Sequence, residues 1–178
     1  DSDPRLWKFA ALGDPQVEIL LFRQPNAQVL LREVTAVKEW MNSGFALHTM
    51  RDHPTHNWTV VPNLWAVRAN TDKTSPESIN SPASLADLRE ELYRNFMGNY
   101  RPFNDQLLLT EVIWPILQVS VMQHDSLHCK QFYGSRPFPT ERTFGHWVGC
   151  PAHGYVETFK WVCPKECRPP KHEDWIYC

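Results

Sequence analysis

The chain has 178 residues, of which 42% are hydrophobic and 21% are charged, and its formal net charge is −2. This length and composition are typical of one folded domain with a hydrophobic core, not of a disordered segment. Lys and Arg form no block, so we do not expect nucleic acid or an acidic membrane surface as a partner. No apolar run approaches the roughly 18 residues of a transmembrane helix, so we expect no membrane span.

Strands and one helix are predicted in the first third of the chain. Residues 7–12 and 17–22 are short apolar runs, and the second is nearly all apolar, as in a buried central strand. A polar loop with Gln24 and Asn26 follows at its carboxyl end, where open α/β sheets bind ligands. Residues 32–42 predict an amphipathic helix. The side chains expected on its buried face are Val34, Val37, Trp40 and Met41.

A polar stretch over residues 48–58 is the first candidate site, and we expect it on a loop because a proline interrupts it. Arg51 has a planar fork that suits a carboxylate or a phosphate, and Asp52 could accept sugar hydroxyls. The alternative is a salt bridge between them that fixes the loop. His53, with His48 and His56, could bind zinc or copper. Their spacing matches no metal motif, so a loop His53 that bonds its neighbours is the simpler interpretation.

The second half of the chain supplies another polar cluster. Short strands are expected at 59–61 and 64–67, a polar surface loop at 70–83, and helices at 84–97 and 105–117. Trp114, on the apolar face of the last helix, is expected in the core. Asp105 and Gln106 begin that helix; aspartate is a helix cap there, but the pair also has the donors and acceptors that sugar hydroxyls need. A strand at 119–122 leads into His124 and Asp125, and we expect both pairs to face residues 48–58 across a cleft.

A loop-rich, cysteine-rich tail spans residues 129–178, with short strands expected at 147–149 and 159–162. A zinc knuckle at Cys163 and Cys167 would need further ligands such as His172 and Cys178, whereas disulfides suit a loose chain end better. With five cysteines, one stays free or bonds another chain. Asn57 begins an N-glycosylation sequon, which together with disulfides favours a secreted protein. The disulfide candidates are Cys129, Cys150, Cys163, Cys167 and Cys178.

A family resemblance is carried by short motifs in a fixed order. They are Arg23-x-x-Asn26, Arg32-Glu33-x-x-Ala36-Val37-x-x-Trp40, His48-x-Met50-Arg51-Asp52-His53-Pro54-x-His56, Leu64-Trp65, Asp105-Gln106, Trp114-Pro115, His124-Asp125-Ser126 and Phe138-Pro139-Thr140-x-Arg142. This set resembles a poorly characterised family of secreted or lumenal glycosyltransferase-like proteins of the GT-A type, similar in layout to the retaining, glycogenin-like enzymes. The resemblance implies a GT-A-like α/β fold, with a mixed sheet flanked by helices, in one domain over residues 1–178. The usual first nucleotide-binding strands would lie upstream of Asp1.

The resemblance also implies a metal site that this chain has lost in part. The two aspartates of the family's DxD motif, which bind a divalent cation and through it a nucleotide diphosphate, correspond to Gln24 and Asn26. Both are neutral amides, whereas a hard cation such as Mn²⁺ needs carboxylate charge. The third ligand of the glycogenin-like enzymes is a late histidine, for which His124 is the candidate. Side chains also replace the family's glycines over residues 62–66, which narrows the donor pocket.

We therefore predict a secreted, catalytically decayed glycosyltransferase-like protein that needs no cofactor and binds a saccharide or glycoprotein in a lectin-like manner. One alternative is an active retaining glycosyltransferase that uses a nucleotide sugar, with Mn²⁺ or without metal. The other is an extracellular structural, storage or metal-binding protein without a sugar site. The expected ligand contacts are Arg51, Asp52, His53, Asp105, Gln106, His124 and Asp125.

Overall fold

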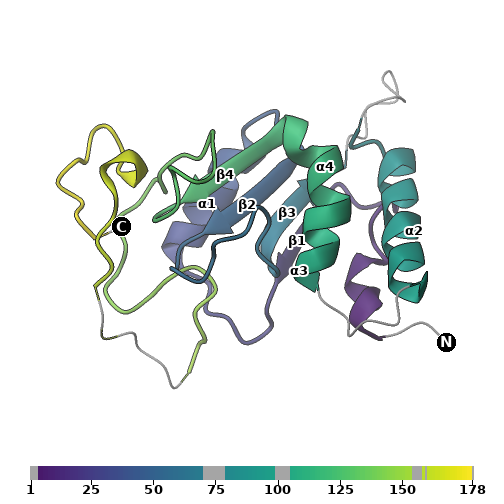
Figure 1. Ribbon diagram of the computed structural model, residues 1–178, viewed down its shortest axis with the longest axis horizontal. Coiled ribbons are helices and arrows are strands. Elements are labelled where there is room, and N and C mark those ends of the chain that lie inside the picture. Colours follow the sequence, from purple (N-terminus) through teal and green to yellow (C-terminus); the bar gives the residue numbers. More distant parts are fainter. Residues whose placement is uncertain (1–3, 70–78, 99–104, 154–157, 159, 178) are drawn as a thin grey trace.

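The computed structural model describes residues 4–69, 79–98, 105–153, 158 and 160–177. Its centre is an open four-stranded sheet in the order β1-β3-β2-β4 (Figure 1), formed by β1 (Ile19–Arg23), β2 (Leu47–Arg51), β3 (Leu64–Arg68) and β4 (Val121–Asp125). β3 pairs antiparallel with β1 and with β2, whereas β2 and β4 run parallel. The predicted mixed α/β sheet with flanking helices is thus confirmed. Among the described residues, no helix combines the length and apolarity needed to cross a membrane.

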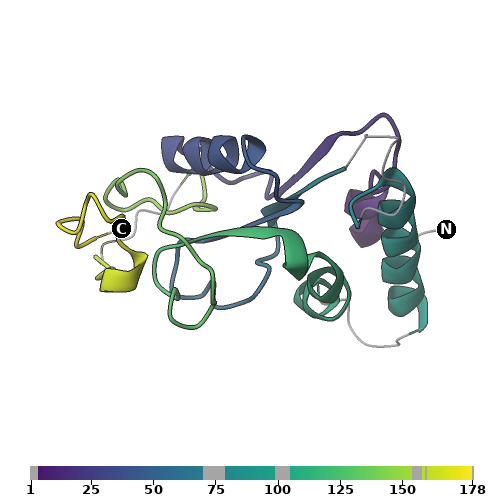
Figure 2. The ribbon, with the colours of Figure 1, turned by 90° about the horizontal axis from the view of Figure 1, so that it is seen from above.

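Helices cover both faces of this sheet. Seen edge-on in Figure 2, α1 (Leu31–Met41) lies on one face and the helix that contains α3 (Asp105–Leu108) and α4 (Trp114–Leu117) lies on the other. α2 (Pro82–Gly98) packs at one end of the molecule beside the 3₁₀ helix η1 (Pro4–Phe9), and the C-terminal tail lies at the opposite end. A last 3₁₀ turn, η4 (Lys165–Cys167), belongs to that tail.

The strand predicted at residues 7–12 is wrong, because this segment forms η1 and a following turn. Its buried apolar side chains are Leu6, Phe9 and Leu12, which recur every three residues. A period of three places them on one face of a 3₁₀ helix, whereas a half-buried strand would need a period of two.

β1 forms where the apolar run predicted a strand, but it is an edge strand and not the central one. Phe22 points into the core and stacks on Trp65 of β3 at 3.8 Å between ring centroids, whereas Leu21 is 48% exposed. The uninterrupted apolar run did not predict that buried and exposed side chains alternate along β1. Which faces of a strand are buried depends on its position in the sheet, and the run does not specify that position.

Several other strand predictions differ from the structure. No strand forms at two of the predicted segments, 59–61 and 147–149, or in the described part (160–162) of the one predicted at 159–162. β4 begins two residues later than predicted. β2 extends through residue 51, so the polar stretch begins inside a buried strand and not on a loop. Residues 70–78, most of the predicted surface loop, lie outside the described residues.

The helix that begins at residue 105 is continuous but changes its winding. Between α3 and α4 it runs as a π-helix, η2 (Leu109–Ile113), in which the Trp114 N–H donates to the Leu109 carbonyl. Pro115 follows at the start of α4. Proline has no N–H and its ring clashes with the carbonyl four residues earlier, so the wider π turn accommodates it. A short 3₁₀ turn, η3 (Gln118–Ser120), then leads into β4.

The core side of α1 differs from the apolar face that its sequence predicts. Trp40 is fully buried as expected, but Met41 is 44% exposed. In its place, Arg32 and Glu33 are buried together with Ala36. The helix therefore turns two charged side chains inward, Arg32 toward the residues that follow β2 and β4, and Glu33 toward Arg23 at the end of β1.

We predict that Gly13→Ala destabilises the fold by about 2 kcal/mol or more. Gly13 has φ +78°, and a Cβ there would overlap the backbone of Ala86 in α2. The matched control is Gly44→Ala, because a Cβ at Gly44 meets nothing within 4 Å. Urea unfolding of both variants checks this, and equal midpoints would contradict the close approach of residue 13 to α2.

Candidate functional site

The parallel pairing of β2 and β4 places two oppositely charged side chains side by side. In this register Arg51 lies opposite Asp125, and Arg51 Nε donates to Asp125 Oδ2 at 2.6 Å. The other guanidinium nitrogens donate to Gln123 Oε1 at 2.7 Å and to the Thr59 carbonyl at 2.8 Å. Arg51 and Asp125 are both fully buried. This ion pair therefore holds the carboxyl ends of the two strands together and leaves Arg51 no face for a ligand.

Asp52 occupies a second buried ionic cluster, one residue further along. Its carboxylate accepts from Arg32 Nε at 3.2 Å, from Arg142 Nη2 at 2.8 Å and from the Val148 N–H at 2.9 Å, and the Ser126 hydroxyl also donates to it. Burial alone would raise the pKa of Asp52, but the two guanidinium groups outweigh burial and hold it below the ordinary value. Asp52 is therefore a buried carboxylate anion that joins α1 to the 126–148 segment.

A hydrogen-bonded chain leads from the sheet to the surface of α1. The ring nitrogens His48 Nε2 and His124 Nδ1 lie 2.8 Å apart, and His124 Nε2 lies 3.2 Å from Glu39 Oε2. Burial lowers the pKa of both histidines, for His124 against the opposing effect of Glu39. Hydrogen bonds from His124 and Arg136 lower the pKa of Glu39 to about 2. Neutral imidazoles thus connect a buried strand to a half-exposed carboxylate.

The residues that the family resemblance assigns to metal binding do not form a cation site. Gln24 and Asn26 are exposed neutral amides on the loop after β1, whereas His124 is buried on β4 with both ring nitrogens engaged. In the part of the chain that the structure describes, one group of three candidate ligand residues comes close enough for a metal, Asp125 with Cys129 and Cys167. Those two sulfurs are joined in a disulfide and are not thiolates, so this group does not suit a metal either.

The other predicted contacts lie apart from these clusters. Asp105 forms an ion pair with Lys8 of η1, and Gln106 is buried and donates to the Val60 carbonyl at 3.0 Å. His53 is half-buried, exchanges a hydrogen bond with Thr55 and packs near Trp147. The fold thus brings Arg51, Asp52, His124 and Asp125 together, but it does not place Asp105 and Gln106 across a cleft from them.

The tail is tied by disulfide bonding, as predicted. Cys129 and Cys167 form a disulfide, Cys163 is also disulfide-bonded, and Cys150 is a buried free thiol. A zinc knuckle at Cys163 and Cys167 is therefore wrong, because these sulfurs are oxidised. Cys178 lies outside the described residues.

Asn57, the predicted glycosylation site, is exposed in the segment between β2 and β3. An exposed sequon is accessible to modification.

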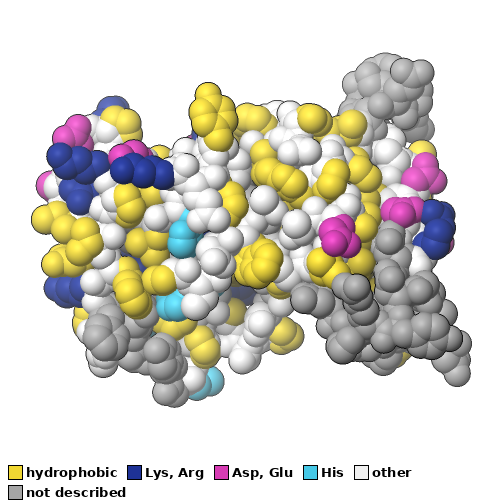
Figure 3. Space-filling view, viewed as in Figure 1, with side chains coloured by type: hydrophobic (Ala, Val, Ile, Leu, Met, Phe, Trp, Pro, Cys, Tyr) yellow, Lys and Arg dark blue, Asp and Glu magenta, His cyan; other side chains and the backbone are white. Residues whose placement is uncertain are grey.

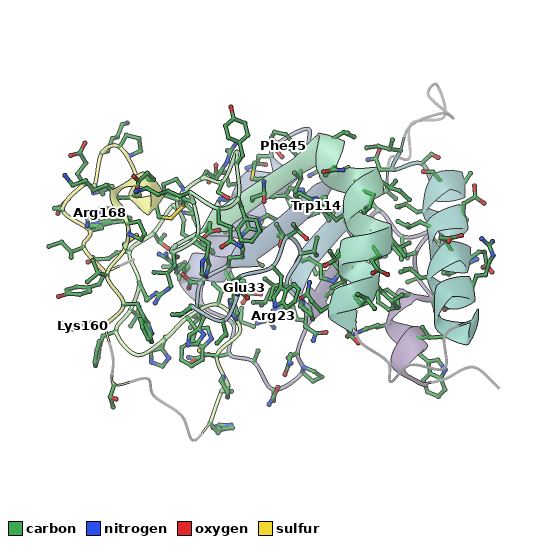
Figure 4. The ribbon with its side chains drawn as sticks, in the orientation of Figure 1. Arg23, Glu33, Phe45, Trp114, Lys160 and Arg168 are labelled. Atoms are coloured by element: carbon green, nitrogen blue, oxygen red, sulfur yellow. A yellow bond between two sulfur atoms is a disulfide. The ribbon has the colours of Figure 1, made fainter. Side chains whose placement is uncertain are left out.

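A groove of about 570 Å³ lies among the described residues, and the sequence did not point to it. It lies between α4, residues 121 and 123 of β4, and the turn at 131–134. Trp114 projects from α4 beside it (Figure 4); it is half-buried and packs against the hydrophobic core, so the predicted core tryptophan lies at the edge of the core. Tyr133, on the turn, is 99% exposed. The lining residues are Thr59, Trp114, Gln118, Val121, Gln123, Gln131, Phe132, Tyr133 and Gly134.

Two residues that line the groove, Gln123 and Phe132, also contact Arg51 of the Arg51–Asp125 pair. Gln123 Nε2 donates to the Tyr133 carbonyl at 3.0 Å while its Oε1 accepts from Arg51. The ring of Phe132 lies 4.0 Å from the Arg51 guanidinium carbon. The ionic cluster therefore fixes the position of the 131–134 turn and, with it, one side of the groove.

Comparison of the chain with protein-family models, with curated proteins and with solved structures gave no match. A function therefore has to rest on the residues and on the two sites described above, the buried ionic clusters and the groove.

We predict that Asp52→Asn destabilises the protein by about 3–5 kcal/mol, because it leaves Arg32 and Arg142 buried without a counter-charge. Glu90→Gln, which breaks an exposed pair with Arg89, is the matched control and should cost less than about 1 kcal/mol. Chemical denaturation of both variants measures the difference. If both cost the same small amount, Asp52 is not the centre of the network.

Stability should fall as the pH decreases from about 6.5 to about 4. Burial lowers the pKa of His56 from 6.5 to about 4, and His48 and His124 shift in the same direction. Below pH 6.5 the unfolded chain binds protons that the folded chain does not, so the free energy of unfolding decreases with falling pH. Melting temperatures across this range check the trend, and His56→Asn should make it shallower. A flat profile, or one that His56→Asn leaves unchanged, would contradict this.

Proposed function

We propose that this chain is a secreted, glycosyltransferase-like protein that binds a saccharide and does not transfer one from a nucleotide sugar. The observation that supports saccharide binding is the groove, because it combines one exposed and two half-buried aromatic rings with several amide side chains. Aromatic faces such as that of Trp114 pack against the apolar face of a sugar ring, and amides donate to and accept from hydroxyls. The volume of the groove lies within the range of small-molecule sites in proteins.

The proposed loss of transfer rests on the residues at the expected donor site. A nucleotide diphosphate needs a cation or a set of accessible positive charges, and Gln24 and Asn26 supply neither. Arg51 is fully buried and bonded to Asp125, so it cannot reach a phosphate without breaking a buried ion pair.

The saccharide contacts of this proposal therefore differ from those that the sequence suggested. Arg51, Asp52, His124 and Asp125 hold the fold together, and the Arg51–Asp125 pair also supports the groove through Gln123 and Phe132. Direct contact is assigned to the groove residues, with Trp114 and Tyr133 as the stacking rings. Secretion is supported by the Cys129–Cys167 disulfide and by the exposed sequon at Asn57.

We predict that Trp114→Ala and Tyr133→Ala each weaken binding to a saccharide identified on a glycan array by roughly tenfold or more. Tyr133 contributes its backbone carbonyl to the Gln123 contact, so truncating its side chain leaves the turn in place. Trp7→Ala is the matched control, because Trp7 is 64% exposed on η1 and outside the groove. Calorimetric titration of the three variants tests the proposal. Full affinity in both groove variants, or no glycan bound by the parent chain, would refute it.

Loss of the donor site is tested separately by melting the protein with UDP and with UDP-sugars, each with and without Mn²⁺. We expect no change in the melting temperature, since only a ligand that favours the folded state raises it. A metal-dependent rise of several degrees would instead support the active glycosyltransferase.

A further inference from the structure

The groove differs from the rest of the surface in its lack of charge. Among the described residues that line it, none is acidic or basic. Figure 3 shows that charged side chains on this face gather mainly toward the two ends of the molecule. We infer that the groove selects an uncharged saccharide, held by the amides of Gln118 and Gln131; this rests on the proposed function.

The nearest buried charge is insulated from a ligand in the groove. Arg51 has no exposed surface, its guanidinium is neutralised by Asp125 at 2.6 Å, and the ring of Phe132 lies against it at 4.0 Å. A carboxylate or sulfate in the groove would therefore lose part of its hydration without gaining a counter-ion. This cost selects against acidic sugars.

The three groove glutamines differ in what they can offer to a ligand. Gln123 uses both ends of its amide inside the protein, with Arg51 and with the Tyr133 carbonyl, and so holds the turn. Gln118 donates to the Pro115 carbonyl at 3.3 Å, which leaves its oxygen able to accept.

Gln131 is exposed, and within the described chain its side-chain amide has no hydrogen-bond partner, so its donors and its acceptor are all available. Two glutamines on opposite walls, one on the turn and one at the end of α4, can thus bond hydroxyl or acetamido groups of a neutral sugar. Trp114, on the same wall as Gln118, supplies an apolar face for the sugar ring.

The experiment is a glycan array of neutral oligosaccharides printed beside the sialylated, sulfated and uronic-acid forms of the same cores, followed by calorimetry on the best neutral glycan and its acidic form. We expect the neutral form to bind at least about tenfold more tightly, with an affinity that changes little between low and high NaCl. Preference for the acidic form, or a steep loss of binding with salt, overturns the inference but leaves saccharide binding intact. Binding to no glycan overturns both.

Variants test the assigned amides. Gln131→Ala and Gln118→Ala should each weaken the neutral glycan several-fold, and Gln131→Lys should move the preference toward the acidic form. Gln16→Ala, an exposed glutamine outside the groove, is the matched control and should bind as the parent chain does. Unchanged affinity in both alanine variants would overturn the assignment of Gln118 and Gln131.

Discussion

The buried charges at the ends of β2 and β4 are the constraint on which the rest of the structure depends. Arg51 and Arg32 each carry several N–H donors into the interior, and every unpaired donor there would be costly. Carbonyls of irregular segments accept from some of these donors, that of the nearby Thr59 from Arg51 and that of the distant Thr140 from Arg32. Replacing a buried ion pair with apolar side chains is often neutral, whereas removing one partner is expensive. The network therefore specifies the arrangement of the irregular 126–148 segment more than it adds net stability.

Local patterns in the sequence were enough for much of the framework. α1, α2, β1 and β3 follow from hydrophobic periodicity and from proline and glycine positions, whereas β2 was expected on a loop. Patterns failed where the outcome depends on distant partners. Nothing near Leu21 tells that β1 lies at the edge of the sheet, and nothing near Arg32 tells that a helical arginine meets an aspartate from another element. Charged residues are exposed in most proteins, so burial of this set could not be inferred from type alone.

For the candidate site too, the sequence identified the residues but not the contacts that they make with distant parts of the chain. The sequence marked Arg51, Asp52, His124 and Asp125 as a functional group, and the fold does assemble them, but as internal partners of one another. The groove could not be predicted because its walls come from separate segments of the chain and contain ordinary glutamines. The available signal was Pro115 directly after Trp114, since a proline inside a helical pattern indicates an irregular turn and such turns are frequent at functional sites.

The parallel pairing of β2 with β4 also has a consequence for the time course of folding. Arg51 and Asp125 are 74 residues apart in the chain, and the other strands and most of the helices lie between or before them. Contacts of such long sequence separation form slowly, because the chain loses the entropy of closing the intervening loop before the strand pairing contributes stabilising free energy. During synthesis, β2 can pair with β3 early, but its other edge stays open until residues 121–125 emerge and dock. That edge is then exposed to other chains, so the nascent protein is most vulnerable to misassembly just before its charged centre closes.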